Sequence, residues 1–356
     1  MEKGKGYFTK EKKERRVTPA CIRRIRIKSA ALLMLMLFSL SLPTVGLAQS
    51  VTWRLHGDQA VTFWWSEELQ KFADEVTRAT GGEVKLEFYP SSSLGVKAKD
   101  ILAPVGSGAI EMAEFVASYV AGEAPYLTIF GLPMVAVNVE EGYKIMDATR
   151  AKIESKLAAD YDLKLLASLS SSPLQLYLGK NPFENVESFR GLRIRTLGVD
   201  QEFFIRSLGA TPVNVPIGDM PTAVATNQVD GAIAGTQYFV LQKFAQYGPN
   251  ILAWNAILGP GYLVVGQKKW QSISPAAREA ILKVSKTFED RVWARAATLE
   301  DTLQKNAAGD GFKILHLTPA DRADLVAKAE PAWRNWAKRA GQLGQELLEI
   351  AMKTSK

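Results

Sequence analysis

Three arginines lie close together near the middle of the chain, and one of them is placed to bind an anion. Residues Leu192 to Leu197 alternate with the period of a strand, which Gly198 ends. Arg195 lies near the carboxyl end of this predicted strand, where open parallel α/β sheets bind their ligands. Its guanidinium has a fixed fork of donors that can hold a carboxylate through two parallel hydrogen bonds. We therefore predict that Arg195 binds an organic acid, whereas Arg190 and Arg193 are expected to be solvated or to cover the sheet.

The segments after this strand predict a parallel sheet with crossover helices. Residues 200–208 have a helical pattern that Gly209 ends, and residues 212–216 predict a second strand. A helix opened by Asp219 and a third strand over residues 231–234 follow. Strands joined through a helix run parallel, so this unit predicts α/β structure around Arg195.

The first half of the chain after residue 50 also alternates strand and helix patterns. An amphipathic helix is expected over residues 62–80, with one apolar stripe formed by Trp65, Leu69, Phe72 and Val76. Residues 96–105 predict a helix that Pro104 ends or kinks. A short strand over residues 109–116 is followed by an expected loop around Ser118 and Tyr119.

The second half contains segments that are expected to connect two lobes. The chain is too long for one compact core. A strand over residues 174–178 leads toward the arginine unit, and residues 257–266 predict a long strand interrupted by Pro260. Residues 275–308 predict a helix far longer than average. Several passages between the lobes predict a hinge.

The N-terminus has the pattern of a cleaved secretory signal peptide over residues 1–48. It is basic up to Lys28, apolar from Ala30 to Leu42, and ends in small residues at Ala48. This leader contains 11 Lys and Arg, 3 acidic residues and the only cysteine, Cys21. The remaining 33 basic and 34 acidic residues give a net charge of −1, which removes any argument for nucleic-acid binding.

Motifs for metal, phosphate or nucleophilic chemistry are missing from the sequence. The chain contains no Cys-x-x-Cys, His-Glu-x-x-His, phosphate-loop or Gly-x-Ser-x-Gly pattern. His316 is expected to be structural, while His56 ends the first strand and could face a ligand. We therefore expect no catalytic residues, no metal and no cofactor, although catalysis by carboxylates alone stays open.

Several segments, in their order and spacing, resemble one transport family. These are Thr80-Gly-Gly-Glu-Val-Lys-Leu-Glu-Phe-Tyr-Pro, Gly108-Ala-Ile-Glu-Met-Ala, Gly131-Leu-Pro, Phe189-Arg-Gly-Leu-Arg-Ile-Arg, Leu208-Gly-Ala-Thr-Pro and Gln228-Val-Asp-Gly-Ala. The chain after the leader is similar to the DctP-type solute-binding proteins of tripartite ATP-independent periplasmic (TRAP) transporters.

The resemblance implies a two-lobed periplasmic-binding-protein fold of class α/β, with mostly parallel sheets flanked by helices and a long helix spanning both lobes. Lobe I is expected at residues 49–170 plus about 261–300, and lobe II at residues 171–260 plus about 301–356. The resemblance also implies a periplasmic monomer that closes over an organic acid and delivers it to TRAP permease subunits. In this family the arginine that matches Arg195 forms the salt bridge to the ligand.

Two departures from the family narrow the expected ligand. Gln175 stands near a position where some members have a second arginine, and a branch that binds 2-oxo acids has glutamine there. Ile233 and Ala234 replace the Glu-Asn of many members. Both changes favour a small or largely apolar monocarboxylate, or a 2-oxo or hydroxy acid, over a dicarboxylate.

Further candidates for ligand contact lie near strand ends or at a helix start: Tyr119, Gln237, Tyr238 and Trp64. For each aromatic, packing in the core is at least as good an explanation as ligand contact. Two other function classes stay open: a binding protein of an ATP-driven importer, and a secreted enzyme that uses carboxylates.

Overall fold

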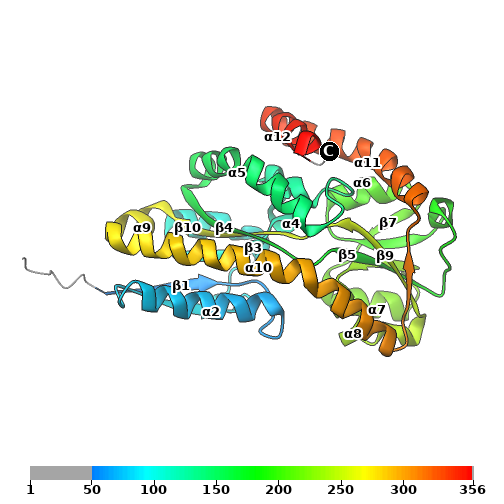
Figure 1. Cartoon of the computed structure of the whole chain (residues 1–356), viewed down its shortest axis with the longest axis horizontal. Coiled ribbons are helices and arrows are strands. Elements are labelled where there is room, and N and C mark those ends of the chain that lie inside the picture. Colours follow the sequence, from blue (N-terminus) through cyan, green and yellow to red (C-terminus); the bar gives the residue numbers. More distant parts are fainter. Residues whose placement is uncertain (1–49, 355–356) are drawn as a thin grey trace, which may run out of the picture. The chain divides into compact units, whose positions relative to one another are not determined.

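Two β-sheets form the framework of the computed structural model, which describes residues 50–354 (Figure 1). The first sheet has the strand order β2-β1-β3-β10-β4. Its strands are β1 (Val51–His56), β2 (Val84–Tyr89), β3 (Met112–Val116), β4 (Leu163–Ser170) and β10 (Pro260–Gly266). β1 runs parallel to β2 and β3, whereas β10 runs antiparallel to β3 and β4.

The second sheet has the strand order β11-β9-β5-β8-β6-β7. Its strands are β5 (Leu174–Gly179), β6 (Arg193–Thr196), β7 (Thr211–Asn214), β8 (Gly231–Ala234), β9 (Asn250–Ile257) and β11 (Lys313–His316). β6 lies between β7 and β8 and is parallel to both, which confirms the predicted unit around Arg195. Gly198, with φ of +94°, turns the chain from β6 into the following helix.

Helices flank both sheets, so the predicted α/β class is confirmed. Those before β5 are α2 (Trp64–Ala79), α3 (Leu102–Ser107), α4 (Ala117–Val120) and α5 (Val139–Tyr161). Those after β5 are α6 (Val199–Ser207), α7 (Met220–Ala225), α8 (Thr236–Leu241), α9 (Gln267–Ser272), α10 (Pro275–Gly309), α11 (Pro319–Arg339) and α12 (Gly341–Thr354). The predicted stripe of α2 is confirmed, because Trp65, Leu69, Phe72 and Val76 are all buried.

Three local predictions were wrong. Pro104 lies in the first turn of α3 instead of ending a helix, because a proline there loses no hydrogen bond of the helix. Tyr119 belongs to the short helix α4 and not to a loop. Residues 257–266 are not one interrupted strand: β9 ends at Ile257 in the second sheet, and β10 begins at Pro260 in the first.

The chain passes between the two sheets at the β4–β5 and β9–β10 connections, and α10 packs on elements of both (Figure 1). α10 begins at the N-cap Ser274, whose hydroxyl accepts a hydrogen bond from the amide of Ala277. It contacts α2, β4 and α5 beside the first sheet, and α8 and β11 beside the second. The boundaries of the lobes stay a prediction. α12, which this prediction places in lobe II, packs against α5.

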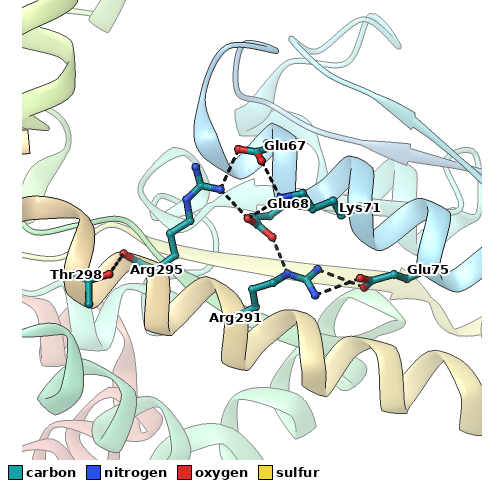
Figure 2. Close-up of polar contacts among 7 residues, drawn as sticks. All are labelled: Glu67, Glu68, Lys71, Glu75, Arg291, Arg295 and Thr298. Carbon is teal, nitrogen blue, oxygen red and sulfur yellow. Dashed lines mark hydrogen bonds and ion pairs between the residues drawn. The ribbon is translucent and has the colours of Figure 1, made fainter. Parts of the chain in front are cut away.

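Charged side chains hold α2 against α10 (Figure 2). Glu68 accepts hydrogen bonds from Arg291 Nε at 2.7 Å and from Arg295 Nη1 at 2.6 Å. Arg291 also donates to both carboxylate oxygens of Glu75. Burial alone would raise the pKa of Glu68, but its hydrogen bonds with Arg291 and Arg295 hold this pKa below its ordinary value. Glu68 is therefore the buried centre of this network, with a side chain only 3% exposed.

We expect Glu68→Ala to lower the free energy of unfolding by roughly 2 kcal/mol. This is less than the ~3–5 kcal/mol for one partner of a fully buried pair, because the two arginines can recover water. Glu75→Ala is the matched control on the same helix; its carboxylate is partly exposed, and we expect it to cost less than about 1 kcal/mol. Urea unfolding of the three proteins measures both values, and equal losses would contradict the central role of Glu68.

Candidate functional site

Arg195 is held in place by two backbone carbonyls at the ends of neighbouring strands. Its Nε donates to Val215 O at 2.8 Å, and its Nη1 donates to Ile233 O at 2.7 Å. The residue is 2% exposed, and within residues 50–354 its buried Nη2 has no hydrogen-bond partner. One edge of the guanidinium is therefore fixed by the fold, and donors remain free on the other side.

The charge of Arg195 is not balanced by a carboxylate of the described chain. Arg195 forms no ion pair within residues 50–354, whereas Arg193 pairs with Asp230 and Arg190 with Glu187 at the surface. Burial lowers the pKa of Arg195 to about 10, while Tyr119 and Tyr238 act in the opposite direction. The guanidinium is thus still protonated at neutral pH. A buried cation without a counter-ion is costly, which makes this position suited to an anion supplied from outside the chain.

Tyr119 connects Arg195 with acidic residues of the first sheet. It lies in α4, directly after β3, and is half-buried. Its hydroxyl interacts electrostatically with Arg195 and also with Asp58 and Glu114. Burial, followed by these two carboxyls, raises the pKa of Tyr119, so its hydroxyl stays protonated and can donate a hydrogen bond. The predicted site residues Arg195 and Tyr119 are therefore brought together from the two sheets.

Glu114 and Asp58 are the residues of this cluster that sequence reasoning missed. Glu114 lies in the middle of β3 and is fully buried. Its Oε2 is 3.4 Å from the amide of Asp58, and its Oε1 has no hydrogen-bond partner within the described chain. Burial, and secondly the charge of Asp58, raise the pKa of Glu114 to about 8. The signal in the sequence was an acidic residue inside an otherwise apolar strand.

Asp58 follows the carboxyl end of β1 and is partly buried. Its Oδ1 accepts a hydrogen bond from Ser92 Oγ at 3.1 Å. Burial raises the pKa of Asp58, and the bond from Ser92 opposes this shift. No Lys or Arg within residues 50–354 forms an ion pair with Asp58 or Glu114. Both carboxyls thus lie beside Tyr119 without a cationic partner of their own.

Tyr238 approaches Arg195 from the second sheet. It lies in the first turn of α8, which follows β8, and its hydroxyl donates to Ile217 O at 2.5 Å. Tyr238 and Arg195 interact electrostatically, so a second tyrosine lies near the guanidinium. Gln237 is its half-buried neighbour in the same turn. Ligand contact by Tyr238 and Gln237 stays a prediction.

Gln175 uses its amide inside the protein. Its Nε2 donates to Asn255 Oδ1 at 2.6 Å and to Pro173 O at 3.2 Å, and its Oε1 accepts from the amide of Asn255 at 3.2 Å. The side chain also interacts with the buried carboxyl of Glu300 on α10. In this structure Gln175 supports the β5–β9 junction, and direct contact with a ligand stays a prediction.

His56 and Trp64, two further predicted ligand contacts, are both buried side chains. His56 pairs with Ala113, so strand alternation puts its side chain on the opposite face of the first sheet from Glu114. Its ring is buried without a hydrogen-bond partner in the described chain, and burial lowers its pKa. Trp64 is buried at the start of α2, with the guanidinium of Arg295 5.3 Å from its ring centroid. Trp64 also packs against the rings of Phe63 and Trp65. Ligand contact by His56 and Trp64 stays a prediction.

Other parts of the described chain offer less for a ligand. Two surface grooves border α2, and neither is lined by Arg195 or Glu114. In the first groove, Lys85 and Glu87 form an ion pair with each other. Within residues 50–354 no group of three or more His, Asp or Glu residues is arranged to hold a metal. No helix in this part of the chain is both long and apolar enough to span a membrane. The predicted signal peptide lies outside the described residues.

Comparison with known proteins gives consistent matches over most of the chain. The model of the family described as bacterial extracellular solute-binding protein, family 7 (DctP), matches residues 59–339. A solute-binding protein of Chromohalobacter salexigens is 24% identical over 328 residues, which are 91% of this chain and 95% of that protein. The 2,3-diketo-L-gulonate-binding periplasmic protein YiaO of Escherichia coli is 25% identical over 242 residues, which are 65% of this chain and 70% of that protein.

A solved structure has the same fold. DctP7 of Bordetella pertussis, an extracytoplasmic solute receptor binding pyroglutamic acid, matches with a TM-score of 0.76 at 23% identity. The match covers 85% of this chain and 99% of that protein. The predicted two-lobed binding-protein fold is therefore confirmed.

Proposed function

The chain belongs to the DctP family of bacterial extracellular solute-binding proteins, and from this premise we propose that it captures a small organic acid at Arg195. The observation that carries the proposal is the buried Nη2 of Arg195, which lacks a hydrogen-bond partner within residues 50–354. A carboxylate at this position would accept the free donors and balance the buried charge. Tyr119, which lies near the guanidinium, can add a neutral hydrogen-bond donor, whereas the hydroxyl of Tyr238 already donates to Ile217 O.

We propose a ligand with a single carboxylate. Tyr119, Asp58, Glu114 and Arg195 form one cluster, and among the described residues Arg195 is the only arginine in it. A second carboxylate in this cluster would find no further cation to balance its charge, and a buried charge without a counter-ion is costly. This agrees with the 2-oxo or hydroxy monocarboxylates favoured by the sequence. Among relatives, YiaO binds 2,3-diketo-L-gulonate and DctP7 binds pyroglutamic acid, and each of these ligands is an organic acid.

The biological role we propose is delivery of this acid to the membrane permease of a TRAP transporter. The protein would act as a monomer in the periplasm, after removal of residues 1–48. The cluster combines residues next to both sheets. Glu114 lies in a strand of the first sheet, and Asp58 and Tyr119 follow strands of that sheet; Arg195 lies in a strand of the second sheet, and Tyr238 follows one. A ligand bound between them would favour a closed arrangement of the two lobes over an open one.

The experiment is to identify what the purified protein carries and what stabilises it. Small molecules released by denaturation are identified by mass spectrometry, and a thermal-shift screen compares monocarboxylates with dicarboxylates, neutral solutes and cations. We expect a monocarboxylate to be recovered unchanged and to raise the melting temperature. Stabilisation only by neutral or cationic solutes would overturn the proposal and favour an ATP-driven importer, and chemical turnover of the bound acid would favour an enzyme.

A further inference from the structure

A buried carboxyl on α10 joins elements that meet where the chain crosses between the two sheets. Glu300 is buried, and its Oε1 accepts hydrogen bonds from Thr236 Oγ1 at 2.5 Å and from Gln304 Nε2 at 3.1 Å. Thr236 is fully buried and is the first residue of α8, so this bond connects α10 with a helix beside the second sheet. A hydroxyl can both donate and accept, so the bond forms whether Glu300 is ionised or protonated.

The same carboxyl is connected with the first crossover between the sheets. Burial raises the pKa of Glu300, and this shift is opposed by interactions with four polar side chains: Thr236, Gln304, Ser172 and Gln175. Ser172 lies in the β4–β5 connection, and Gln175 lies in β5. Glu300 therefore links α8 and this crossover to a helix that packs on elements beside both sheets (Figure 1).

Further hydrogen bonds join the second crossover to the first. Ser171 N donates to Gly259 O, and Gly259 N donates to Ser171 Oγ, each at 3.0 Å. Asn255 of β9 bonds to Gln175 through its side chain and its amide. Asn255 has φ of +49°, a left-handed conformation that is uncommon outside glycine and persists where surrounding contacts hold it. The two crossovers thus belong to one connected polar network.

This network continues into the backbone that fixes Arg195. Gln175 pairs with Ala234 of β8, and the preceding residue, Ile233, accepts the bond from Arg195 Nη1 through its carbonyl oxygen. Thr236 follows in the same segment, at the start of α8. A displacement of Thr236 relative to α10 would therefore move the carbonyl that holds the guanidinium.

Resting on the proposed function, we propose that Glu300 is a positioning residue of the hinge, which holds the second sheet and Arg195 in a defined orientation to the first sheet through its bond with Thr236. Glu300 acts without touching the ligand. Replacing a buried polar pair by apolar groups is often neutral for stability, so loss of this bond leaves the fold intact. The two sheets would then sample a wider range of orientations, and binding of an acid would include the entropic cost of ordering them.

The first test measures the separation of the sheets without any acid. In a background with Cys21→Ser, which removes the only cysteine, Ala79→Cys on α2 and Ala225→Cys on α7 place spin labels at exposed positions beside the two sheets. Double electron–electron resonance gives the distribution of distances. We expect a wider distribution in Glu300→Leu and in Thr236→Val, which removes the hydroxyl at nearly equal volume. Glu300→Gln, whose amide can still bond to Thr236, should restore the narrow distribution.

Three comparisons make the result specific to this bond. Thr149→Val is the matched control, because Thr149 is fully buried in α5 and its hydroxyl donates to Ile145 O and Met146 O of the same helix. The double variant Glu300→Leu/Thr236→Val should be no wider than either single variant, because both residues act through one bond. Urea unfolding shows which variants are folded, and Thr236→Val carries the test if Glu300→Leu is not.

The second test measures affinity by titration calorimetry, with the acid that gives the largest thermal shift in the screen. We expect Glu300→Leu and Thr236→Val to weaken binding about 10-fold, since changes within a coupling network typically shift it by about 0.5–2 kcal/mol. Glu300→Gln should recover most of this loss.

The outcomes separate this inference from the proposed function. Unchanged distances in both Glu300→Leu and Thr236→Val, or equal widening in Thr149→Val, would overturn the role of Glu300, and so would wild-type affinity in both variants. Failure of every carboxylate to bind would overturn the proposed function alone, because the distances are measured without acid. Wider distances and weaker binding in Glu300→Leu and Thr236→Val, but not in Thr149→Val, support the inference.

Discussion

Arg195→Ala is expected to weaken binding of the organic acid by at least about two orders of magnitude. The guanidinium is buried and already fixed by Val215 and Ile233, so it supplies free donors without reorganisation. An unpaired buried charge costs about 3–5 kcal/mol, and each ~1.4 kcal/mol corresponds to a factor of ten in affinity. A ligand carboxylate that loses both water and Arg195 would pay a comparable penalty. Titration calorimetry with the acid found in the ligand screen measures the change.

Two further variants make this prediction specific. Arg195→Lys is expected to restore only part of the affinity, because a single ammonium cannot replace the planar fork of donors. Arg193→Ala is the matched control on the same strand: Arg193 is exposed and pairs with Asp230, so affinity should stay within a factor of about two. Near-normal binding by Arg195→Ala, or equal losses in Arg193→Ala and Arg195→Ala, would exclude the anchoring role.

The stability of the ligand-free protein is expected to fall by about 2 kcal/mol between pH 6.5 and pH 8 because of Glu114. The pKa of this carboxyl is about 8 in the folded protein and 4.5 in its ordinary state. In this range the folded protein keeps a proton that the unfolded chain has released. The contribution of Glu114 to the free energy of unfolding is therefore fully present below pH 4.5. It is lost as the pH rises through 8, at a rate of up to ~1.4 kcal/mol per pH unit.

Urea unfolding at several pH values tests this effect. Glu114→Gln should remove the slope between pH 6.5 and pH 8, since the amide does not titrate. Burial alone would raise the pKa of Glu111, but its hydrogen bonds with Arg54 hold this pKa below its ordinary value. Glu111 therefore loses its stabilising effect only as the pH falls through its lowered pKa, and Glu111→Gln should keep the wild-type slope. The window also lies above the lowered pKa of His56. A wild-type slope retained in Glu114→Gln would contradict the assignment.

The part of the site that the sequence predicted was local in the chain. The strand around Arg195, the glycine after it and the two crossover helices all follow from the pattern of residues 192–234, and parallel pairing then fixes where a strand ends. Tyr119 and Tyr238 were named because each follows a strand. Short-range periodicity was sufficient for these features.

The part that the sequence did not predict depends on contacts between distant segments. Glu114 was overlooked because its role depends on Asp58, Tyr119 and Arg195, which come from three other elements. Gln175 is predicted to contact the ligand, and its hydrogen bonds with Asn255, 80 residues away, are a feature that the sequence did not reveal. A single sequence does not reveal which buried polar groups have partners, and here this decides which side chains are free for a ligand.

The most direct test of the account is a crystal structure of the protein with its co-purified or best-binding acid. A carboxylate oxygen of the ligand is expected within hydrogen-bond distance, about 2.7–3.2 Å, of Arg195 Nη2. The bonds from Arg195 to Val215 O and Ile233 O should remain as they are without ligand. A bound acid whose carboxylate lies elsewhere, with Nη2 facing only water or a neutral atom, would contradict the central role of Arg195.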